Sequence, residues 1–332
     1  MSDSPLISVA ICTRNRARLL EQVLDSLSSQ VLEPSRWEVL VVDNASEDDT
    51  PRVTRLAAER GLAVRHVLEE ATGLSYARNR AIREARGEYV GFTDDDCLLP
   101  PDWLRTAAEI IEARRPAVFG GPYAPWYASG KPAWFKDSYV DFSLGDEARE
   151  LAGDRFLSGA NVFFRRELAE GADLFDPGLG MRGDSIAYGE EVAVQRELLR
   201  RHPDQLHFYD PRLEVRHLVR EDKMALSWRL RAAFAKGRDV YLANPEQQSR
   251  TSSRPSLATE ILRTALAFGI DTLGALVRDR SRYPYWQQYL CESSGLYLRR
   301  LGRLSVQYKL TAGRPRAPEE PGNGEPRRER VE

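Results

Sequence analysis

Short apolar runs alternate with helically spaced apolar residues over the first 120 positions. The runs at 7–12, 38–42, 63–68 and 88–93 predict buried strands, and Val118 and Phe119 lead into a further one. Apolar residues recur every three to four positions at 19–27, 51–60 and 74–85, and another helix is expected from Pro100 to about Arg114. This alternation predicts an α/β fold with a mostly parallel sheet and helices on both faces.

The pattern changes after this region. Residues 122–153 are rich in aromatic and turn residues and predict a long loop or small irregular insertion, which often carries function. The segments "FLSGANVFFRREL" and "RLEVRHLV" predict strands, and "YGEEVAVQRELLRR" predicts a helix. We expect one α/β domain over 1–222, a helical region over 223–311, and a disordered tail over 312–332, which is rich in proline and charge.

Composition narrows the class of protein. The 332 residues are 42 % apolar and 30 % charged with a net charge of −2, which is typical of a soluble globular protein and gives no basic field for nucleic acid. Three widely spaced cysteines favour a reducing compartment such as the cytoplasm. The N-terminus does not have the pattern of a signal peptide, and no apolar stretch reaches the roughly 20 residues of a spanning helix.

Polar residues gather where three predicted strands end. In open α/β sheets, ligands bind beyond the carboxyl ends of the strands. Polar strand-to-helix loops are also common without a ligand, but three consecutive acids favour a divalent cation, which binds carboxylate and phosphate oxygens together. The residues concerned are Thr13, Arg14 and Asn15 after the first strand, Asp43 and Asn44 after the second, and Asp94, Asp95 and Asp96 after the fourth.

Four segments together resemble the inverting family 2 glycosyltransferases. They are "VAICTRNR", "VLVVDNASEDDT", "GLSYARNRAIREARGEYVGFTDDDC" and "SGANVFFRR…FDPGLG…YGEE", and the similarity extends from about Ser8 to His217. The resemblance implies a single GT-A type domain that binds a nucleotide-diphospho-sugar with Mg²⁺ or Mn²⁺. It also implies transfer to a sugar, lipid-linked or polysaccharide acceptor hydroxyl, as in polysaccharide or glycolipid assembly.

The resemblance assigns roles to individual residues. It places the nucleotide base at Asp43 and Asn44, and the loop flanking base and diphosphate at Thr13, Arg14 and Asn15. Further nucleotide-sugar contacts are implied at Arg78, Asn79, Asp94 and Asp95. The implied metal ligands are Asp96, Asp94 and His217. The catalytic base falls at Glu191, where the family more often has Asp, so Glu190 stays open as the alternative. The implied sugar and acceptor pocket comprises Trp126, Trp134, Ser158, Gly159 and Asn161.

Structural explanations compete with these roles. Glu190 and Glu191 are also the first-turn acids that a helix dipole favours, and since neighbouring helical residues point about 100° apart, only one can face a sugar. His217 is equally compatible with core packing, which is the more common role of tryptophans such as Trp126 and Trp134. Two other functions stay open: a catalytically silent nucleotide-sugar-binding protein, and another Asp-x-Asp metal enzyme such as a phosphatase, although "DDDCLLP" lacks the Thr or Val that the latter requires.

The segment 257–278 predicts a helix with one narrow polar face and a wide apolar arc. The polar face comprises Glu260, Arg263, Thr264, Ala267, Asp271 and Arg278. We expect the arc to be buried against the α/β domain, against a second subunit of a homodimer, or in a membrane interface. The following segment, "RYPYWQQYLCESSGLYLRRLGRLSVQYK", mixes Tyr and Trp with Arg and Lys, which favours peripheral contact with the inner face of a membrane.

Overall fold

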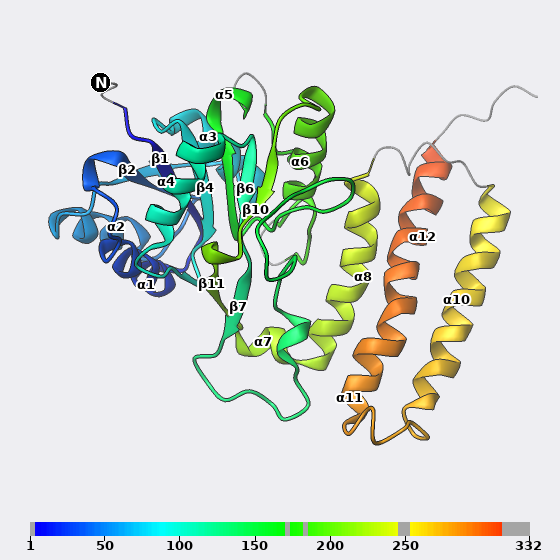
Figure 1. The fold of residues 1–332 in the computed structure, drawn as a ribbon. Coiled ribbons are helices and arrows are strands. Elements are labelled where there is room, and N and C mark those ends of the chain that lie inside the picture. Colours follow the sequence, from blue (N-terminus) through cyan, green and yellow to red (C-terminus); the bar gives the residue numbers. More distant parts are fainter. Residues whose placement is uncertain (1–3, 170–172, 182–184, 245–252, 314–332) are drawn as a thin grey trace, which may run out of the picture.

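The computed structural model describes residues 4–169, 173–181, 185–244 and 253–313. An α/β domain forms one side of the molecule and a layer of long helices forms the other (Figure 1). The fold therefore agrees with the predicted α/β class and with the predicted helical region after it.

The main sheet has eight strands in the order β3-β2-β1-β4-β9-β6-β10-β8. Six of them run parallel, while β9 and β8 pair antiparallel with their neighbours. The sheet is mostly parallel, as predicted. Its strands are β1 (Ile7–Thr13), β2 (Trp37–Asp43), β3 (Val64–Leu68), β4 (Tyr89–Asp94), β6 (Val118–Gly120), β8 (Arg149–Glu150), β9 (Asn161–Arg165) and β10 (His207–Tyr209).

Helices cover both faces of this sheet because each contributes one apolar stripe to a core. On one face, α1 (Ala17–Ser28), α2 (Thr50–Glu59) and α4 (Trp103–Arg114) pack in one hydrophobic cluster. On the other face, α3 (Leu74–Glu84) and α6 (Glu190–Arg201) pack in a second cluster. The short helix α5 (Arg166–Ala169) follows β9.

A small second sheet differs from the sequence-based expectation. Its three strands, β5 (Cys97–Leu98), β11 (Val215–Leu218) and β7 (Tyr123–Trp126), lie in the order β5-β11-β7. The predicted strand "RLEVRHLV" is therefore outside the main sheet, and the region predicted to be irregular contains β7 and β8. The 3₁₀ turns are Pro34–Arg36, Asp137–Tyr139 and Pro211–Leu213. In the second sheet, the pairing of β11 with β5 brings His217 beside the turn that follows β4.

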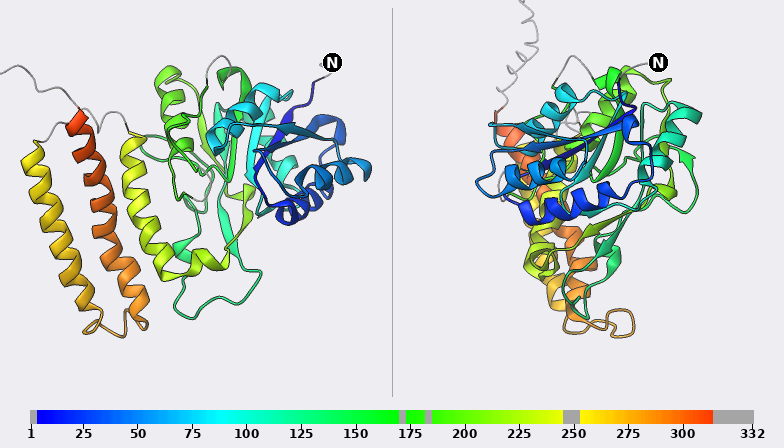
Figure 2. Two further views of the ribbon diagram at one scale, coloured as in Figure 1. Left: turned by 180° about the vertical axis from the view of Figure 1, so that it is seen from behind. Right: turned by 90° about the vertical axis from the view of Figure 1, so that its left-hand side faces the viewer.

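The helical layer comprises α7 (Glu221–Met224), α8 (Leu226–Leu242), α10 (Arg254–Gly274), α11 (Trp286–Tyr289), a π-helical segment (Leu290–Ser294) and α12 (Gly295–Gly313). α12 lies between α8 and α10, and α10 is the outermost helix of the layer (Figures 1 and 2). Glycine permits the close contact of α8 and α12, because a Cβ at Gly237 would collide with the Arg299 carbonyl, and one at Gly302 with that of Phe234. α12 extends to Gly313, and the rest of the predicted tail is outside the described residues.

The orientation of α10 is opposite to the expectation of an apolar arc buried in the protein. Its polar face packs toward the end of the chain: Arg300 pairs with Glu260 at 2.8 Å, and Ser294 donates to Asp271 at 2.6 Å. Leu266 and Ile270 on the apolar arc are 64 % and 63 % exposed. Leu257 at the start of the arc is buried, but the prediction is wrong for most of the arc, because Glu260 and Asp271 find their partners on the adjoining segment. Among the described helices, none is long and apolar enough to cross a membrane.

Candidate active site

The carboxyl ends of β1, β2 and β4 meet at one edge of the main sheet. Thr13 is in register with Asp43 on β2, and Cys12 is in register with Asp94 on β4. The three polar clusters after these strands are consequently neighbours, as the parallel-strand rule predicts.

Asp94 at the end of β4 and the following Asp95 and Asp96 form the acidic turn, and Asp95 is its buried anchoring residue. The Thr13 hydroxyl donates a 2.7 Å hydrogen bond to one carboxylate oxygen, and Arg16 Nη1 donates a 2.8 Å bond to the other. Burial raises the pKa of Asp95 to about 6, although the Arg16 charge opposes this shift. Arg16 was missed by sequence reasoning, although it stands directly after Asn15 in the same loop. The pair ties the β1 loop to the turn after β4.

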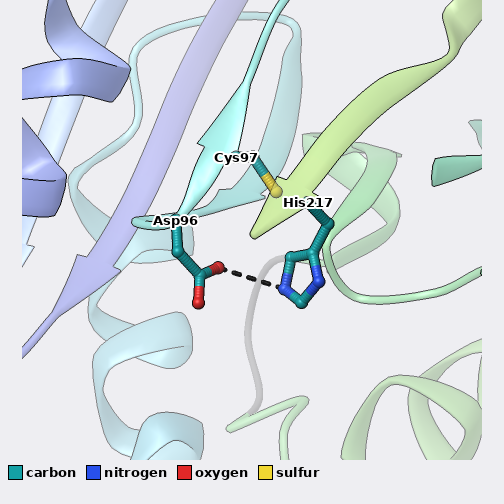
Figure 3. A group of neighbouring side chains, drawn as sticks. All are labelled: Asp96, Cys97 and His217. Atoms are coloured by element: carbon teal, nitrogen blue, oxygen red, sulfur yellow. Dashed lines mark ion pairs between the residues drawn. The ribbon is translucent and has the colours of Figure 1, made fainter. Parts of the chain in front are cut away.

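Asp96 and His217 approach one another across the second sheet (Figure 3). Because β11 pairs antiparallel with β5, His217 is opposite Cys97, and its Nε2 lies 3.0 Å from Asp96 Oδ1 and 3.6 Å from Asp94 Oδ2. Burial lowers the pKa of His217, but the Asp96 and Asp94 carboxylates outweigh it and raise that pKa to about 9. Asp96 Oδ1 is buried and accepts no well-aligned hydrogen bond in the described structure.

Arg78 is the buried centre of the site. Its Nη1 donates to Glu190 Oε1 at 2.8 Å, and its Nη2 donates to the Gly159 carbonyl at 3.2 Å and lies 3.8 Å from Asp94 Oδ1. A Cβ at Gly159 would lie 2.5 Å from Arg78 Nη2, so the close approach depends on glycine at that position. The guanidinium also lies over the ring of Phe92. One cation thus joins the acidic turn to the start of α6.

The two acids at the start of α6 have different surroundings. Gly189 turns the chain into the helix with a φ of +94°. Glu190 is 5 % exposed, and its Oε2 is buried without a hydrogen-bond partner in the described structure, whereas Glu191 is half-buried. Burial and the neighbouring Glu191 carboxylate raise the pKa of Glu190 to about 8. Of the two carboxyl groups, Glu191 is the more accessible.

The residues predicted to hold the nucleotide base lie together but make internal hydrogen bonds. Asp43 accepts from the Ser46 amide at 2.8 Å and lies 3.0 Å from His66 Nε2. The Asn44 side chain donates to the carbonyls of residues 69 and 71 and accepts from the amide of residue 73. Asn15, with a φ of +53°, accepts from the amide of residue 47, and Arg14 is half-buried beside it. These bonds fix the loops that form the edge of the site.

Several residues predicted to contact the sugar, the nucleotide or the acceptor make hydrogen bonds or packing contacts within the protein. Asn79 exchanges two hydrogen bonds with the Phe175 backbone. Asn161 donates to the carbonyls of residues 122 and 213 and accepts from the indole of residue 103. Trp126 is half-buried in β7, and Ser158 accepts from the amide of residue 160 at 3.4 Å. Trp134 packs in a separate cluster with Phe135 and lines a cavity of about 480 Å³ with residues of the helical layer. Their roles in binding a sugar or acceptor stay predictions.

Comparison with known proteins places this geometry in a family. Residues 8–171 match the model of glycosyl transferase family 2. The chain is 23 % identical over 284 residues to a glucosyl-dolichyl phosphate glucuronosyltransferase of Haloferax volcanii, covering 83 % of this chain and 88 % of the relative. It is 28 % identical over 207 residues to the succinoglycan biosynthesis protein ExoM of Rhizobium meliloti, covering 57 % and 65 %. The fold is similar to that of a mannosyltransferase of Pyrobaculum calidifontis solved with GDP-Man and Mn²⁺, with a TM-score of 0.53, 20 % identity, and coverage of 95 % and 77 %.

The chain belongs to glycosyl transferase family 2. The fold expected from the resemblance is confirmed, since the mannosyltransferase has the same GT-A architecture. In this family 2 glycosyltransferase the matched range contains Asp43, Arg78 and the acidic turn, whereas Glu190, Glu191 and His217 lie beyond it. Their place in the site therefore depends on the contacts described above.

The donor atoms around Asp96 fit a hard divalent cation. Carboxylate oxygens are the ligands that Mg²⁺ and Mn²⁺ prefer, and Asp96 Oδ1 is a buried oxygen whose 3.0 Å contact with His217 Nε2 is not a well-aligned hydrogen bond. Ligation through His217 Nε2 would require loss of the ring proton. Cys97 is also within reach of Asp96 and His217, but burial raises the pKa of its thiol well above the usual range, which disfavours the thiolate a metal would need.

Proposed function

We propose that this glycosyltransferase is metal-dependent and inverting. In this proposal, it moves a sugar from a nucleotide-diphospho-sugar to an acceptor hydroxyl in polysaccharide or glycolipid assembly. The observation that carries the proposal is the convergence, through Arg78, of the acidic turn and the acids that begin α6. The cation that binds the diphosphate would then lie on one side of the Arg78 guanidinium, and the carboxylate base would lie on the other side.

Asp94, Asp96 and His217 would hold Mg²⁺ or Mn²⁺, which neutralises charge on the diphosphate leaving group when it is bound. Support comes from the 3.0 Å approach of His217 Nε2 to Asp96 Oδ1 and from the Mn²⁺ in the structurally similar mannosyltransferase. Thr13 and Arg16 hold the turn in place through Asp95, so that Asp94 and Asp96 keep their separation. Asp43, Arg14 and Asn15 would border the nucleotide at the ends of β1 and β2.

Glu191 is the better candidate for the catalytic base. Glu190 Oε1 accepts the Arg78 hydrogen bond, which commits that carboxyl group to positioning the cation. Glu191 is half-buried at the same helix start and can take a proton from an acceptor hydroxyl as it attacks the anomeric carbon. The hydroxyl oxygen bonds to that carbon as the bond to the diphosphate breaks, so a single displacement inverts the configuration.

The relatives support a particular class of donor and of acceptor. The mannosyltransferase was solved with GDP-Man, and the named relatives belong to dolichyl-phosphate glycosylation and succinoglycan biosynthesis. A nucleotide-diphospho-sugar donor and a lipid-linked or polysaccharide acceptor are accordingly proposed for this chain.

A donor screen tests the proposal. Purified protein with Mn²⁺ or Mg²⁺ would be titrated with a panel of nucleotide-sugars, and transfer to isolated lipid-linked and oligosaccharide acceptors would be followed by release of the nucleotide. NMR of the product should show an anomeric configuration opposite to that of the donor. Retention of configuration would contradict the single displacement. Binding of a donor without any transfer to the acceptors would favour a silent binding protein.

A further inference from the structure

The outer surface of α10 is a continuous apolar strip. Its large side chains are 63–86 % exposed and extend into the loop that follows the helix; they are Leu262, Leu266, Ile270, Leu273, Leu276 and Val277. α12 packs only on the opposite side of the helix, and α10 stands at the edge of the molecule in both views (Figures 1 and 2). An apolar strip of this length on the outside of a helix marks a surface that binds something.

The acidic and the basic side chains of α10 and its following loop have different surroundings. The acids of α10 are turned toward the protein, where Glu260 pairs with Arg300, and Asp271 accepts from Tyr289 at 3.0 Å and Ser294 at 2.6 Å. Of the exposed cations, Arg254 lies over the Tyr308 ring of α12 and Arg263 lines a cavity beside α12. The exposed Arg280 and Arg282 belong to the loop after the helix. The exposed acid in the loop, Asp279, accepts two hydrogen bonds from Ser281. The outer surface is thus apolar, and Arg280 and Arg282 form a basic margin at the end of the strip.

Aromatic residues complete this margin at one end. Tyr285 and Trp286, directly after the loop, are 41 % and 47 % exposed. Tyrosine and tryptophan favour the boundary between lipid and water, where the ring is partly buried and its polar atom stays hydrated. Arginine beside them is attracted to anionic headgroups.

We propose that this outer surface of α10, with the loop to Trp286, docks on an anionic lipid membrane. The helix would lie in the interface, with its apolar strip toward the acyl chains and its polar face toward α12. This arrangement explains why the polar face is satisfied within the protein while the apolar face is left uncovered. It does not depend on the proposed catalytic function, because no residue of the active site takes part.

A second copy of the chain fits the surface less well. From Leu262 to Val277 the strip is one helix wide and about 22 Å long, so its footprint is about 220 Å², against the roughly 800 Å² per partner of a standard interface. A two-fold pairing would also bring Arg280 and Arg282 to both sides, where Asp279 is the one exposed acid among the described residues of α10 and its loop. An anionic lipid surface provides the missing negative charge.

Flotation with vesicles tests the proposal in the full-length protein. Vesicles would contain phosphatidylcholine alone or with phosphatidylglycerol. We expect the wild type to float with the anionic vesicles, and the double variant Leu266→Glu/Ile270→Glu to bind them at least tenfold more weakly. The matched control, Val31→Glu/Leu68→Glu, introduces the same charges at sites that are 56 % and 50 % exposed on the α/β domain and should float like the wild type. Equal melting temperatures would show that each variant is folded.

Substitutions in the basic margin give a second test by vesicle flotation. Arg280→Ala/Arg282→Ala should weaken binding to anionic vesicles by about fivefold for each cation lost at low salt, and less at high salt. Wild-type protein that floats with neither vesicle composition would overturn the proposal. So would a wild-type dimer, seen by light scattering, that Leu266→Glu/Ile270→Glu converts to monomer, since the surface would then be covered by a second copy.

Discussion

Arg78 donates a 2.8 Å hydrogen bond to Glu190, and the two side chains are 4 % and 7 % exposed. Arg78 comes from the middle of α3 and Glu190 from the first position of α6, so the contact joins two helices that lie 112 positions apart in the sequence. The same guanidinium binds the Gly159 carbonyl and approaches Asp94. The shape of the site therefore depends on one buried cation.

Replacing this cation should destabilise the protein. Arg78→Met leaves the Glu190 carboxyl and the Gly159 carbonyl without their donor, and we expect a loss of about 2–5 kcal/mol in the free energy of unfolding, measured with urea. Arg83→Met on the same helix is the matched control, because its 2.7 Å pair with Asp173 is exposed and should contribute about 0–1 kcal/mol. Equal losses in the two variants would show that Arg78 is no more than a surface-like contact.

Glu190 should make stability depend on pH. Burial beside Glu191 raises its pKa to about 8 in the folded protein, above the ordinary value of 4.5 in the unfolded chain. The folded state then keeps a proton that the unfolded state releases, so this contribution is full below pH 4.5 and is lost as the pH rises through 8. Since Gln does not titrate, the melting temperature of wild type should fall relative to that of Glu190→Gln between pH 5 and 8.5. A constant difference would contradict the raised pKa.

The base assignment separates the same two acids by kinetics. Glu191→Gln keeps the size and hydrogen bonding of the side chain but cannot accept a proton, so kcat should fall about 10²-fold or more while donor affinity stays nearly the same. Glu190→Gln should instead alter donor binding through Arg78. If the kcat effect appears in Glu190→Gln alone, the two roles are exchanged. If neither variant loses kcat, the base is elsewhere in the site.

Asp96 should control cation binding. Asp96→Ala removes a buried oxygen beside His217, so Mn²⁺ affinity, measured by electron paramagnetic resonance, should decrease and transfer should be abolished. Asp102→Asn is the control, because this acid, whose side chain is 49 % exposed, directly precedes α4 and pairs at 3.4 Å with Arg105. Full transfer by Asp96→Ala in the presence of a chelator would be incompatible with a catalytic metal at this turn.

The strands and their common edge were predictable because they depend on short-range patterns. The apolar runs at 7–12 and 38–42 became β1 and β2, with ends that differ by one residue at most. The rule for parallel strands then placed Thr13, Asp43 and Asp94 together without any knowledge of contacts.

The hydrogen-bond partner of each polar side chain was not predictable from short-range patterns. Asn79 and Asn161 occur in segments typical of the family, yet both bind backbone groups far away in the sequence. Such partners are set by tertiary packing rather than by residue type. The same holds for α10: its period defines a polar and an apolar face, but the partner of Glu260 is Arg300, which lies 40 positions later. The sequence pattern alone could not say which face meets the protein.

The loop after β7 is fastened to the end of the chain. Gln288 donates to the Trp134 carbonyl at 3.0 Å, Lys136 pairs with Glu292 at 2.5 Å, and the Tyr139 hydroxyl donates to the same carboxylate at 2.7 Å. Hydrogen bonds and an ion pair therefore link α10, through Tyr289 and residues 288–292, to a loop whose first strand pairs with the strand of His217. If α10 docks on a surface as proposed, a displacement of that helix would be passed along these contacts to the loop beside the candidate active site.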